Sequence, residues 1–234
     1  MIGSPRVHHR VTDSTNERAK ELAAAGAPHG TLVTADEQTA GRGRQGREWT
    51  APPRSAVLMS VVLRELDERH ALLPLAAALA VCDACECEGS VMAGCQVKWP
   101  NDVWINGRKV AGILIEGRPQ QGWAVVGVGL NVWMDTEDFP PELRETATSL
   151  LIEEGAPPIE QMLSGIVDHL DEWLGAPPAG VLEAWRSRDA LKGQPVRWTG
   201  GEGVASGIDD SGALVVETST GLVSLDAGEV HLLR

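Results

Sequence analysis

The chain has 234 residues, 43% hydrophobic and 23% charged, which fits a globular protein of one medium domain or one domain with a small appendage. No apolar run approaches the roughly 20 residues of a membrane-spanning helix, and the polar, basic Met1–Arg10 is unlike a signal peptide, so we expect a cytoplasmic protein with no membrane partner. The net charge of −13 disfavours non-specific contact with nucleic acid and makes any cluster of cations conspicuous.

The first half of the chain predicts alternating helices and strands. Ser14 and Glu17 form a capping-box pattern that begins a helix, and Gly26 is a typical C′ glycine that ends it. The elements expected next are a strand at 30–36, a long polar loop at 37–53, a buried strand at 56–63 and an alanine-rich helix at 73–88.

The second half predicts a continuation of the sheet and then a different texture. Asn106-Gly107 predicts a hairpin turn between strands at 103–105 and 109–116. A further strand is expected at 122–132, and helices at 159–174 and 181–190. Short strands with intervening turns then indicate a small β-barrel, at 195–198, 203–208, 213–217, 221–224 and 230–233. The sequence therefore predicts an α/β (α+β) domain at 1–190 and a β-barrel module at 191–234.

Four cysteines lie close together in the sequence: Cys82, Cys85, Cys87 and Cys95. The first two form a C-x-x-C pattern, which is found in metal and redox sites. Within a helix they share one face, where small buried thiols pack as alanine does. No second C-x-x-C or histidine pair follows, so a structural role is favoured over a metal site, and disulfides are not expected.

The polar loop contains Gly41-Arg-Gly-Arg-Gln-Gly46, which matches the pattern G-x-G-x-x-G. A dinucleotide-binding turn lies directly between a strand and a helix, whereas Trp49 and two prolines follow this pattern inside a long loop. Glycines allow close approach of a ligand, and Arg42, Arg44 and Arg47 offer forked donors to carboxylate or phosphate. The loop therefore indicates an anion-binding site, the alternative being a flexible basic surface loop.

Two later segments add candidate site residues. Lys98-Trp-Pro-Asn-Asp102 is followed, after the hairpin turn, by Lys109 at the start of a strand, where a lysine is often just a solvated end. Gly112 within that strand, and glycines and an asparagine in Val126-Gly-Val-Gly-Leu-Asn131, are unusual in buried strands and suggest close approach by a ligand or backbone.

Together these segments resemble the biotin–protein ligase family over nearly the whole chain. The order and spacing match for Ser14-Thr15-Asn16, Gln38, the Gly41–Arg47 loop, Trp49, Lys98–Asp102, Arg108–Glu116 and Gly127–Asn131, and the last forty residues resemble its C-terminal barrel, including Gly207-Ile-Asp and Gly228-Glu-Val. The resemblance implies a catalytic domain like that of class II aminoacyl-tRNA synthetases, with helices flanking a mixed central sheet, and an SH3-like barrel. It also implies an enzyme that forms biotinyl-5′-AMP from biotin and ATP and passes biotin to a lysine of a carrier domain.

The resemblance further implies a role for individual residues. The biotin site it implies comprises Ser14, Thr15, Asn16, Gln38, Gly41, Arg42, Gly43, Arg44, Lys109 and Gly112. The ATP site comprises Arg42, Arg47, Trp49, Lys98, Asn101, Lys109 and Asn131. Catalytic roles fall to Arg44, Lys98, Asp102 and Lys109. Mg²⁺ is expected on the ATP phosphates, with Asn131 as its nearest side chain rather than a cage of ligands.

Some roles stay open at the level of sequence. Asp102 either orients or deprotonates the acceptor lysine or forms a structural ion pair with Lys98. Trp49 either contacts ATP or anchors the loop, and Trp104 is a candidate core residue. The Gly41–Arg47 loop is expected to act as a lid, so Thr39–Glu48 should become ordered when ligand binds.

Other function classes are weighed against this one. A lipoate–protein ligase is the nearest alternative, followed by a nucleic-acid-binding module and an inactive binding module. The acidic balance and the lack of stacking aromatics near the loop argue against nucleic acid. Because the Ser-Thr-Asn triplet begins at residue 14, we expect no helix-turn-helix domain before it and no DNA partner. The expected partners are biotin, ATP and the biotin carboxyl carrier domain of carboxylases, and a homodimer is left open.

Overall fold

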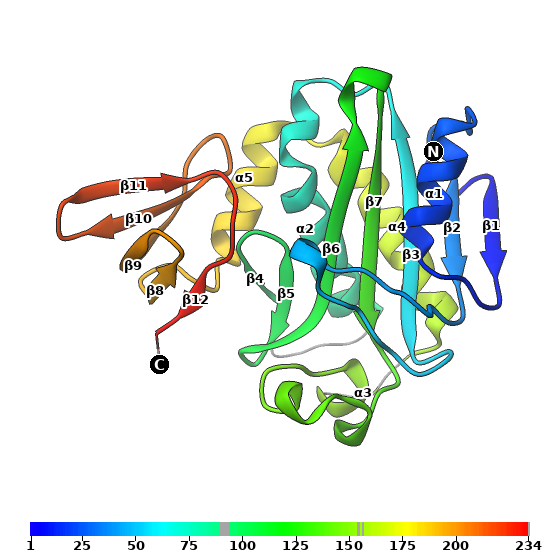
Figure 1. Ribbon diagram of the computed structural model, residues 1–234. Coiled ribbons are helices and arrows are strands. Elements are labelled where there is room, and N and C mark those ends of the chain that lie inside the picture. The colour runs from blue at the N-terminus through cyan, green and yellow to red at the C-terminus, as the bar shows by residue number, and fades with distance from the viewer. Residues whose placement is uncertain (89–93, 154, 156, 234) are drawn as a thin grey trace.

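The computed structural model describes residues 1–88, 94–153, 155 and 157–233. Its main element is a seven-stranded mixed sheet, shown in Figure 1, in which only the edge pair β1–β2 is parallel. In spatial order the strands are β1 (Arg6–His9), β2 (Leu32–Ala35), β3 (Ala56–Arg64), β7 (Trp123–Asn131), β6 (Arg108–Arg118), β5 (Asp102–Ile105) and β4 (Gln96–Lys98). The predicted mixed α/β sheet is confirmed, and β1 is an additional strand that the sequence did not indicate.

Helices lie on both faces of this sheet. On one face α2 (Leu73–Cys87) and α4 (Ile159–Gly175) pack on each other and on the strands, and α5 (Pro178–Ser187) packs against α2. On the other face α1 (Thr15–Ala24) packs on β2, β3 and β7. The shorter helical segments are η1 (Arg44–Gly46), η2 (Glu68–Leu72), η3 (Pro119–Gln121), η4 (Thr136–Asp138), η5 (Pro141–Leu143) and α3 (Leu150–Glu153). Because α1 is short, it leaves part of its face free for a site.

The start of α1 differs from the predicted capping box. Ser14 is the N-cap residue, but its side chain makes no capping hydrogen bond. Instead, Gln38 Oε1 accepts hydrogen bonds from the Thr15 backbone N–H at 2.7 Å and from the Thr15 hydroxyl at 3.1 Å. Glu17, the other residue of the predicted capping box, forms ion pairs with Lys20 and Arg42. The end of the helix is as expected, with Gly26 at a φ of +91° just beyond it.

The last helix also differs from its predicted range of 181–190. It begins at Pro178, where proline suits the first helical turn, and ends before Arg188. Asp189 then pairs with Val97 as an isolated bridge and accepts a hydrogen bond from the Leu191 N–H. The bridge to the main sheet therefore ends the helix earlier than its periodicity suggested.

The C-terminal strands form a second, antiparallel sheet. Its spatial order is β11 (Gly221–Leu225), β10 (Leu214–Thr218), β9 (Gly201–Ile208), β8 (Pro195–Trp198) and β12 (His231–Leu232). Within the described residues β11 and β12 are unpaired edges, so the predicted closure into a barrel is not confirmed. The inward residues of this sheet belong to the same hydrophobic cluster as the main sheet and α2.

Polar contacts also connect the second sheet to the first. The indole N–H of Trp99 donates to the carbonyl oxygen of Gly212 at 3.1 Å, and Arg186 pairs with Asp210 at 2.8 Å. A side chain at Gly212 would meet Leu72 and Leu75, each 3.1 Å from its Cβ position. The β9–β10 turn is therefore seated against the end of the Lys98–Asp102 segment.

Three of the cysteines, Cys82, Cys85 and Cys87, lie on α2, and Cys95 lies directly before β4. Cys82, Cys85 and Cys95 are buried free thiols and Cys87 is an exposed one. Burial raises the pKa of the Cys82 thiol well above its usual value. No group of metal-ligating side chains occurs in the described part of the chain. The burial of Cys82 and Cys85 agrees with their predicted packing role on one face of α2.

The segment His70–Cys87 is 18 residues long, with a mean hydropathy of 1.4, and passes a length-and-composition test for a membrane span. The sequence interpretation overlooked it. Since 67% of it is buried in the protein, it fits the core helix of a globular fold.

Candidate active site

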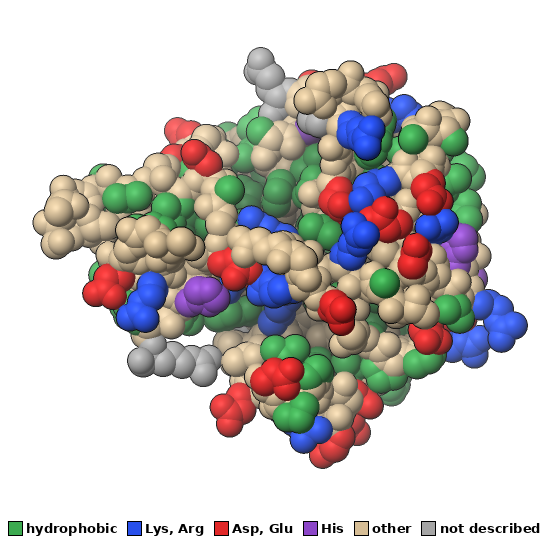
Figure 2. All heavy atoms as spheres, viewed as in Figure 1, with side chains coloured by type: hydrophobic (Ala, Val, Ile, Leu, Met, Phe, Trp, Pro, Cys, Tyr) green, Lys and Arg blue, Asp and Glu red, His purple; other side chains and the backbone are tan. Residues whose placement is uncertain are grey.

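A cavity of about 550 Å³ opens on the sheet face that α1 leaves free, within the size range of small-molecule sites. Its walls are β6, β7, the β2–β3 loop, the segment after β7 and the end of the chain. Figure 2 shows cationic side chains gathered in this hollow between the two sheets. The predicted site residues that line it are Ser14, Thr15, Asn16, Gln38, Arg42, Gly43, Arg44, Arg47, Trp49, Lys98, Asn101, Asp102, Lys109, Gly112 and Asn131.

Glycines form the floor of the cavity because neighbouring side chains lie flat on the strands. Gly112 and Gly129 are direct partners in the β6–β7 pairing, and the indole of Trp49 lies over both of them. A Cβ at Gly129 would lie 2.5 Å from the Trp49 ring. Similarly, a Cβ at Gly127 would overlap the amide of Asn16. The glycines thus seat Trp49 and Asn16, which explains their place in buried strands.

The triplet at the start of α1 forms a buried polar corner of the cavity. Ser14, Thr15 and Asn16 are each less than 5% exposed. The Ser60 hydroxyl on β3 donates to Asn16 Oδ1 at 2.6 Å and lies 2.8 Å from the Thr15 hydroxyl. Asn16 Nδ2 in turn donates to Glu116 Oε2 at 2.9 Å. The corner presents fixed hydrogen-bonding groups of the kind that recognise a neutral polar ligand group.

The glycine- and arginine-rich loop folds back on itself over the cavity. The backbone N–H of Trp49 donates to the Gly41 carbonyl at 2.9 Å, and the backbone N–H of Gly43 donates to the Arg47 carbonyl at 2.7 Å. A Cβ at Gly41 would overlap the Trp49 carbonyl, so this residue serves the turn and lies in an outer groove rather than in the cavity lining. Its direct contact with biotin stays a prediction.

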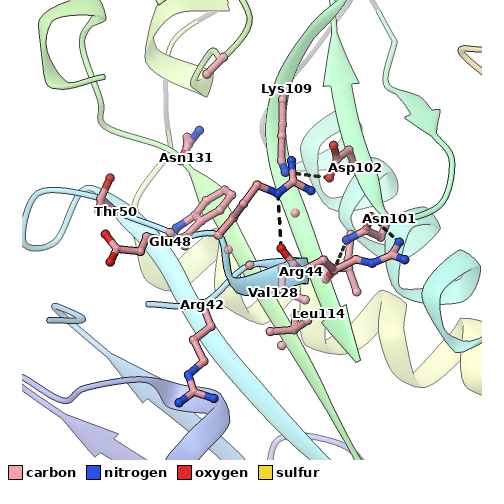
Figure 3. Close-up of a pocket in the computed structure, with 18 of the residues that line it drawn as sticks. Arg42, Arg44, Glu48, Thr50, Asn101, Asp102, Lys109, Leu114, Val128 and Asn131 are labelled. Carbon is pink, nitrogen blue, oxygen red and sulfur yellow. Dashed lines mark hydrogen bonds and ion pairs between the residues drawn. The ribbon is translucent and has the colours of Figure 1, made fainter. Parts of the chain in front are cut away.

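Arg42 and Arg44 of the loop point in different directions (Figure 3). Arg44 donates to Asn101 Oδ1 at 3.3 Å, and Arg47 pairs with Glu229 of the C-terminal segment. Arg42 points away from this cluster and pairs with Glu17 on α1 at 2.5 Å. One short loop is therefore tied to three separate parts of the fold.

Lys109 and Asp102 face each other across the β5–β6 pair. Lys109 Nζ lies 2.7 Å from Asp102 Oδ1 and 5.7 Å from the centre of the Trp49 ring. Lys98 stands over the Trp104 ring at 5.5 Å, so the sequence hypothesis that it forms the ion pair with Asp102 is wrong. A bulge between Val103 and Trp104 accounts for this, because it shifts the register and brings Lys109 to Asp102.

Burial lowers the pKa values of two cations in the cavity, Lys98 and Arg44. Desolvation is the largest influence on Lys98 and lowers the pKa of its ammonium, and the nearby charges of Lys109 and Arg47 lower it further. Burial likewise lowers the pKa of Arg44. Desolvated cations of this kind are stabilised by an anion entering the cavity, since it replaces the water they have lost.

Asn131 is buried at the end of β7, and its Nδ2 donates to the Thr148 carbonyl at 2.9 Å. The amide nitrogen is thereby committed, and the amide oxygen is the end that remains for a ligand. An oxygen ligand suits Mg²⁺, although no side-chain cage for a metal exists among the described residues. The amide oxygen of Asn131 therefore fits a contact with such an ion.

Sequence reasoning missed two walls of the cavity. One is the segment after β7, which contributes Phe139, Pro140, Leu143, Thr146 and Ala147. The other is the C-terminal segment, from which His231 and Leu232 line the cavity and Glu229 holds Arg47. Gly228-Glu-Val had been noted only as part of the barrel. No local pattern places either segment near the loop arginines.

Cations around a glycine floor, beside a neutral polar corner, define an enzyme site that brings anionic substrates together. Comparisons with known proteins agree with that class. Residues 8–132 match the biotin/lipoate A/B protein ligase family, and residues 193–233 match the biotin protein ligase C-terminal domain. The chain belongs to the biotin/lipoate A/B protein ligase family, and its relatives are biotin–protein ligases.

Individual relatives cover nearly all of the chain. A biotin–[acetyl-CoA-carboxylase] ligase of Mycobacterium tuberculosis is 38% identical over 95% of this chain and 87% of its own. The bifunctional ligase/repressor BirA of Bacillus subtilis is 35% identical over 99% of this chain and 75% of its own. The biotin protein ligase of Aquifex aeolicus in complex with biotin and ATP superimposes with a TM-score of 0.86, at 28% identity over 99% of this chain and 100% of its own. The predicted ligase class is confirmed.

Proposed function

We propose that this cavity carries out ATP-dependent biotin ligation, first forming biotinyl-5′-AMP and then biotinylating a lysine of a carrier domain. The observation that carries the proposal is the convergence of Arg44, Arg47, Lys98 and Lys109 on one cavity. A carboxylate must attack an α-phosphate in the first step, and both are anions. Four cations around one cavity counter that repulsion and hold the reactants in line.

The polar corner suits the neutral end of biotin. Thr15 and Asn16 offer hydroxyl and amide groups for the ureido ring, with Gln38 fixing Thr15 at the helix start. The carboxylate of biotin would then lie toward Lys109, whose ammonium is held over the Trp49 ring. Attack of a carboxylate oxygen on the α-phosphorus forms the mixed anhydride and releases pyrophosphate, whose charge Arg47 and Lys98 are placed to balance.

In the second step an acceptor lysine amine attacks the acyl carbon and AMP leaves. Asp102 is the carboxylate nearest Lys109, so it orients that ammonium and stands ready to accept a proton from the incoming amine. Mg²⁺, when bound with ATP, would neutralise phosphate charge, and Asn131 is the side chain suited to contact it.

The open C-terminal sheet is expected to be a divergent SH3-like unit, and the class II synthetase likeness applies to the main sheet. The acceptor is a carrier domain of a carboxylase, in the cytoplasm. The net charge of −13 supports the expectation that this chain does not retain DNA, and a homodimer remains open to measurement by mass.

The decisive experiment is ATP–pyrophosphate exchange with biotin and, separately, with lipoate. Biotin-dependent exchange is the expected result. Exchange with lipoate alone would transfer the proposal to the lipoate branch of the family, and exchange with neither would reject it. A mobility-shift assay with biotin and ATP present checks the DNA expectation, which specific retention would overturn.

A further inference from the structure

The Arg42–Glu17 ion pair joins the glycine- and arginine-rich loop to helix α1. The two side chains come from elements that the sequence keeps 25 residues apart, and the Arg42 Nη1 to Glu17 Oε1 distance is 2.5 Å. Glu17 is 25% exposed and Arg42 is 52% exposed, so the carboxylate is the more shielded partner of the pair. A half-exposed pair of this kind contributes little to overall stability, so its effect is expected on the position of the loop rather than on the fold.

Glu17 is itself fixed by its neighbours on the same surface. Lys20 Nζ lies 2.7 Å from Glu17 and 2.8 Å from Glu116 on β6, and Glu116 accepts the hydrogen bond from Asn16. The bonds to Glu17 and Glu116 raise the pKa of Lys20, and the bonds from Lys20 and Asn16 lower the pKa of Glu116 against the effect of burial. Figure 2 shows these acidic and basic side chains intermixed beside the cavity.

A continuous chain of contacts therefore runs from the loop to the floor of the biotin corner. Arg42 contacts Glu17, Lys20 bridges Glu17 to Glu116, and Glu116 holds the amide of Asn16 against Gly127. The loop is held at its other side by Arg47 on Glu229. With Arg44 inside the cavity, the loop is clamped at both flanks of its functional arginine.

We propose that Glu17 is a positioning residue for biotin ligation: it holds Arg42, and so keeps the glycine- and arginine-rich loop closed over bound biotinyl-5′-AMP. The proposal rests on the proposed function, because it assumes that the adenylate lies beneath this loop. Glu17 touches no reacting atom. It acts through Arg42, and Lys20 and Glu116 set its carboxylate in the position that Arg42 requires.

The test is the rate at which preloaded enzyme releases biotinyl-5′-AMP into a chase of unlabelled biotin and ATP. Glu17→Gln keeps the size of the side chain and removes its charge. It is expected to speed release roughly tenfold while leaving the melting temperature close to that of the unchanged protein. The matched control is Glu21→Gln, which breaks a similar pair with Arg18 on the same helix at 2.8 Å without touching the loop. Equal release from the two variants would overturn the proposal.

A double variant separates positioning from general damage to α1. If Glu17 acts through Arg42, Glu17→Gln combined with Arg42→Gln releases adenylate no faster than Arg42→Gln alone. Additive effects would overturn the proposal. Failure of the proposed function is distinguishable from both results, since the unchanged protein would then form no adenylate in the loading step.

Discussion

Lys109 Nζ lies 2.7 Å from Asp102 Oδ1, and both residues line the cavity. The ammonium is therefore not a solvated strand end, although a lysine at that point in a strand often is one. The ion pair holds Lys109 beside the Trp49 ring. From there the ammonium can exchange Asp102 for a ligand carboxylate or phosphate without a large movement. Two predictions follow, one for each partner.

Replacing Lys109 with alanine should remove the cation nearest the reacting groups. We expect Lys109→Ala to slow adenylate formation by roughly 100- to 1,000-fold, the usual effect of removing one electrostatic contact to a transition state. The melting temperature should change little, because the side chain is 30% exposed. The matched control is Arg108→Ala, whose partner is Glu153 outside the cavity wall, and it should retain activity. Normal pyrophosphate exchange in Lys109→Ala would remove Lys109 from the site.

Asp102→Asn tests whether the carboxylate serves one step or both. An asparagine still hydrogen-bonds Lys109 but neither balances its charge nor accepts a proton. Transfer of biotin from purified adenylate to a carrier domain should therefore fall by roughly 100-fold, the scale of general-base effects. Pyrophosphate exchange should fall less. Equal loss in the two assays would assign Asp102 to orientation of Lys109 alone.

Gly129→Ala tests the seat of Trp49. The new methyl group would lie 2.5 Å from the indole, so Trp49 must move and the β2–β3 loop with it. We expect KM for biotin and ATP to rise by at least about tenfold, while the strand tolerates alanine. Gly175→Ala, where a Cβ meets nothing within 4 Å, is the control. Unaltered kinetics in Gly129→Ala would mean that the position of Trp49 is irrelevant to binding.

Asp189 gives a stability prediction that depends on pH. Burial raises the pKa of this carboxyl above its usual 3.8, because Oδ2 is buried without a hydrogen-bond partner. The folded protein thus binds the proton more tightly than the unfolded chain does, and stability is lost as pH rises from 3.8 through the folded pKa. Asp189→Asn should therefore raise the melting temperature at neutral pH by about 2–4 °C, the shift that about 1 kcal/mol produces at this size.

The control for Asp189 is Asp168→Asn, an exposed position on α4, which should leave the melting curve unchanged. Below pH 3.8 the Asp189→Asn and unchanged proteins should converge, since both then carry a neutral side chain. A difference of the same size at every pH would show that ionisation of Asp189 is not the cause.

The expected lid movement is measured by hydrogen exchange. The backbone amides of residues 39–48 should exchange more slowly with biotin and ATP present than without them, because closure protects them. The amides of β10 serve as an internal reference remote from the cavity. Identical exchange in both conditions would count against a lid while leaving the ligase assignment intact.

Elements that depend on local chemistry could be predicted from the sequence. A continuous apolar run predicted the buried strand at β3, an alanine-rich segment predicted the helix α2, and Gly26 and Asn106-Gly107 marked a helix end and a turn. The loop around Arg44 was found because cations interleaved with glycines are unusual on an acidic chain. These features need only neighbouring residues to be understood, whereas the roles expected of Lys98 and Lys109 rested on the resemblance to the ligase family.

The pairing of charged groups emerged only in the packed fold. An extra residue, Val110, in β6 opposite the Val103–Trp104 step shifts the β5–β6 register and brings Lys109 to Asp102, and the sequence pattern carries no sign of this bulge. The Thr15 N–H at the helix start donates its hydrogen bond to Gln38 Oε1, and Gln38 lies 23 residues from Thr15 in the sequence. Long-range contacts of this kind are set by packing, which local propensity does not encode.

The C-terminal segment also combines a feature that the sequence predicted with contacts that only the packed fold shows. Composition indicated a separate β module, yet the fold brings Glu229 to Arg47 and His231 to the cavity wall. The sequence thus determined the chemistry that is available: cations, glycines and a polar triplet. The tertiary structure decided their partners and directions, because ion pairs and cavities form between side chains that only the packed sheets bring within a few ångströms of one another.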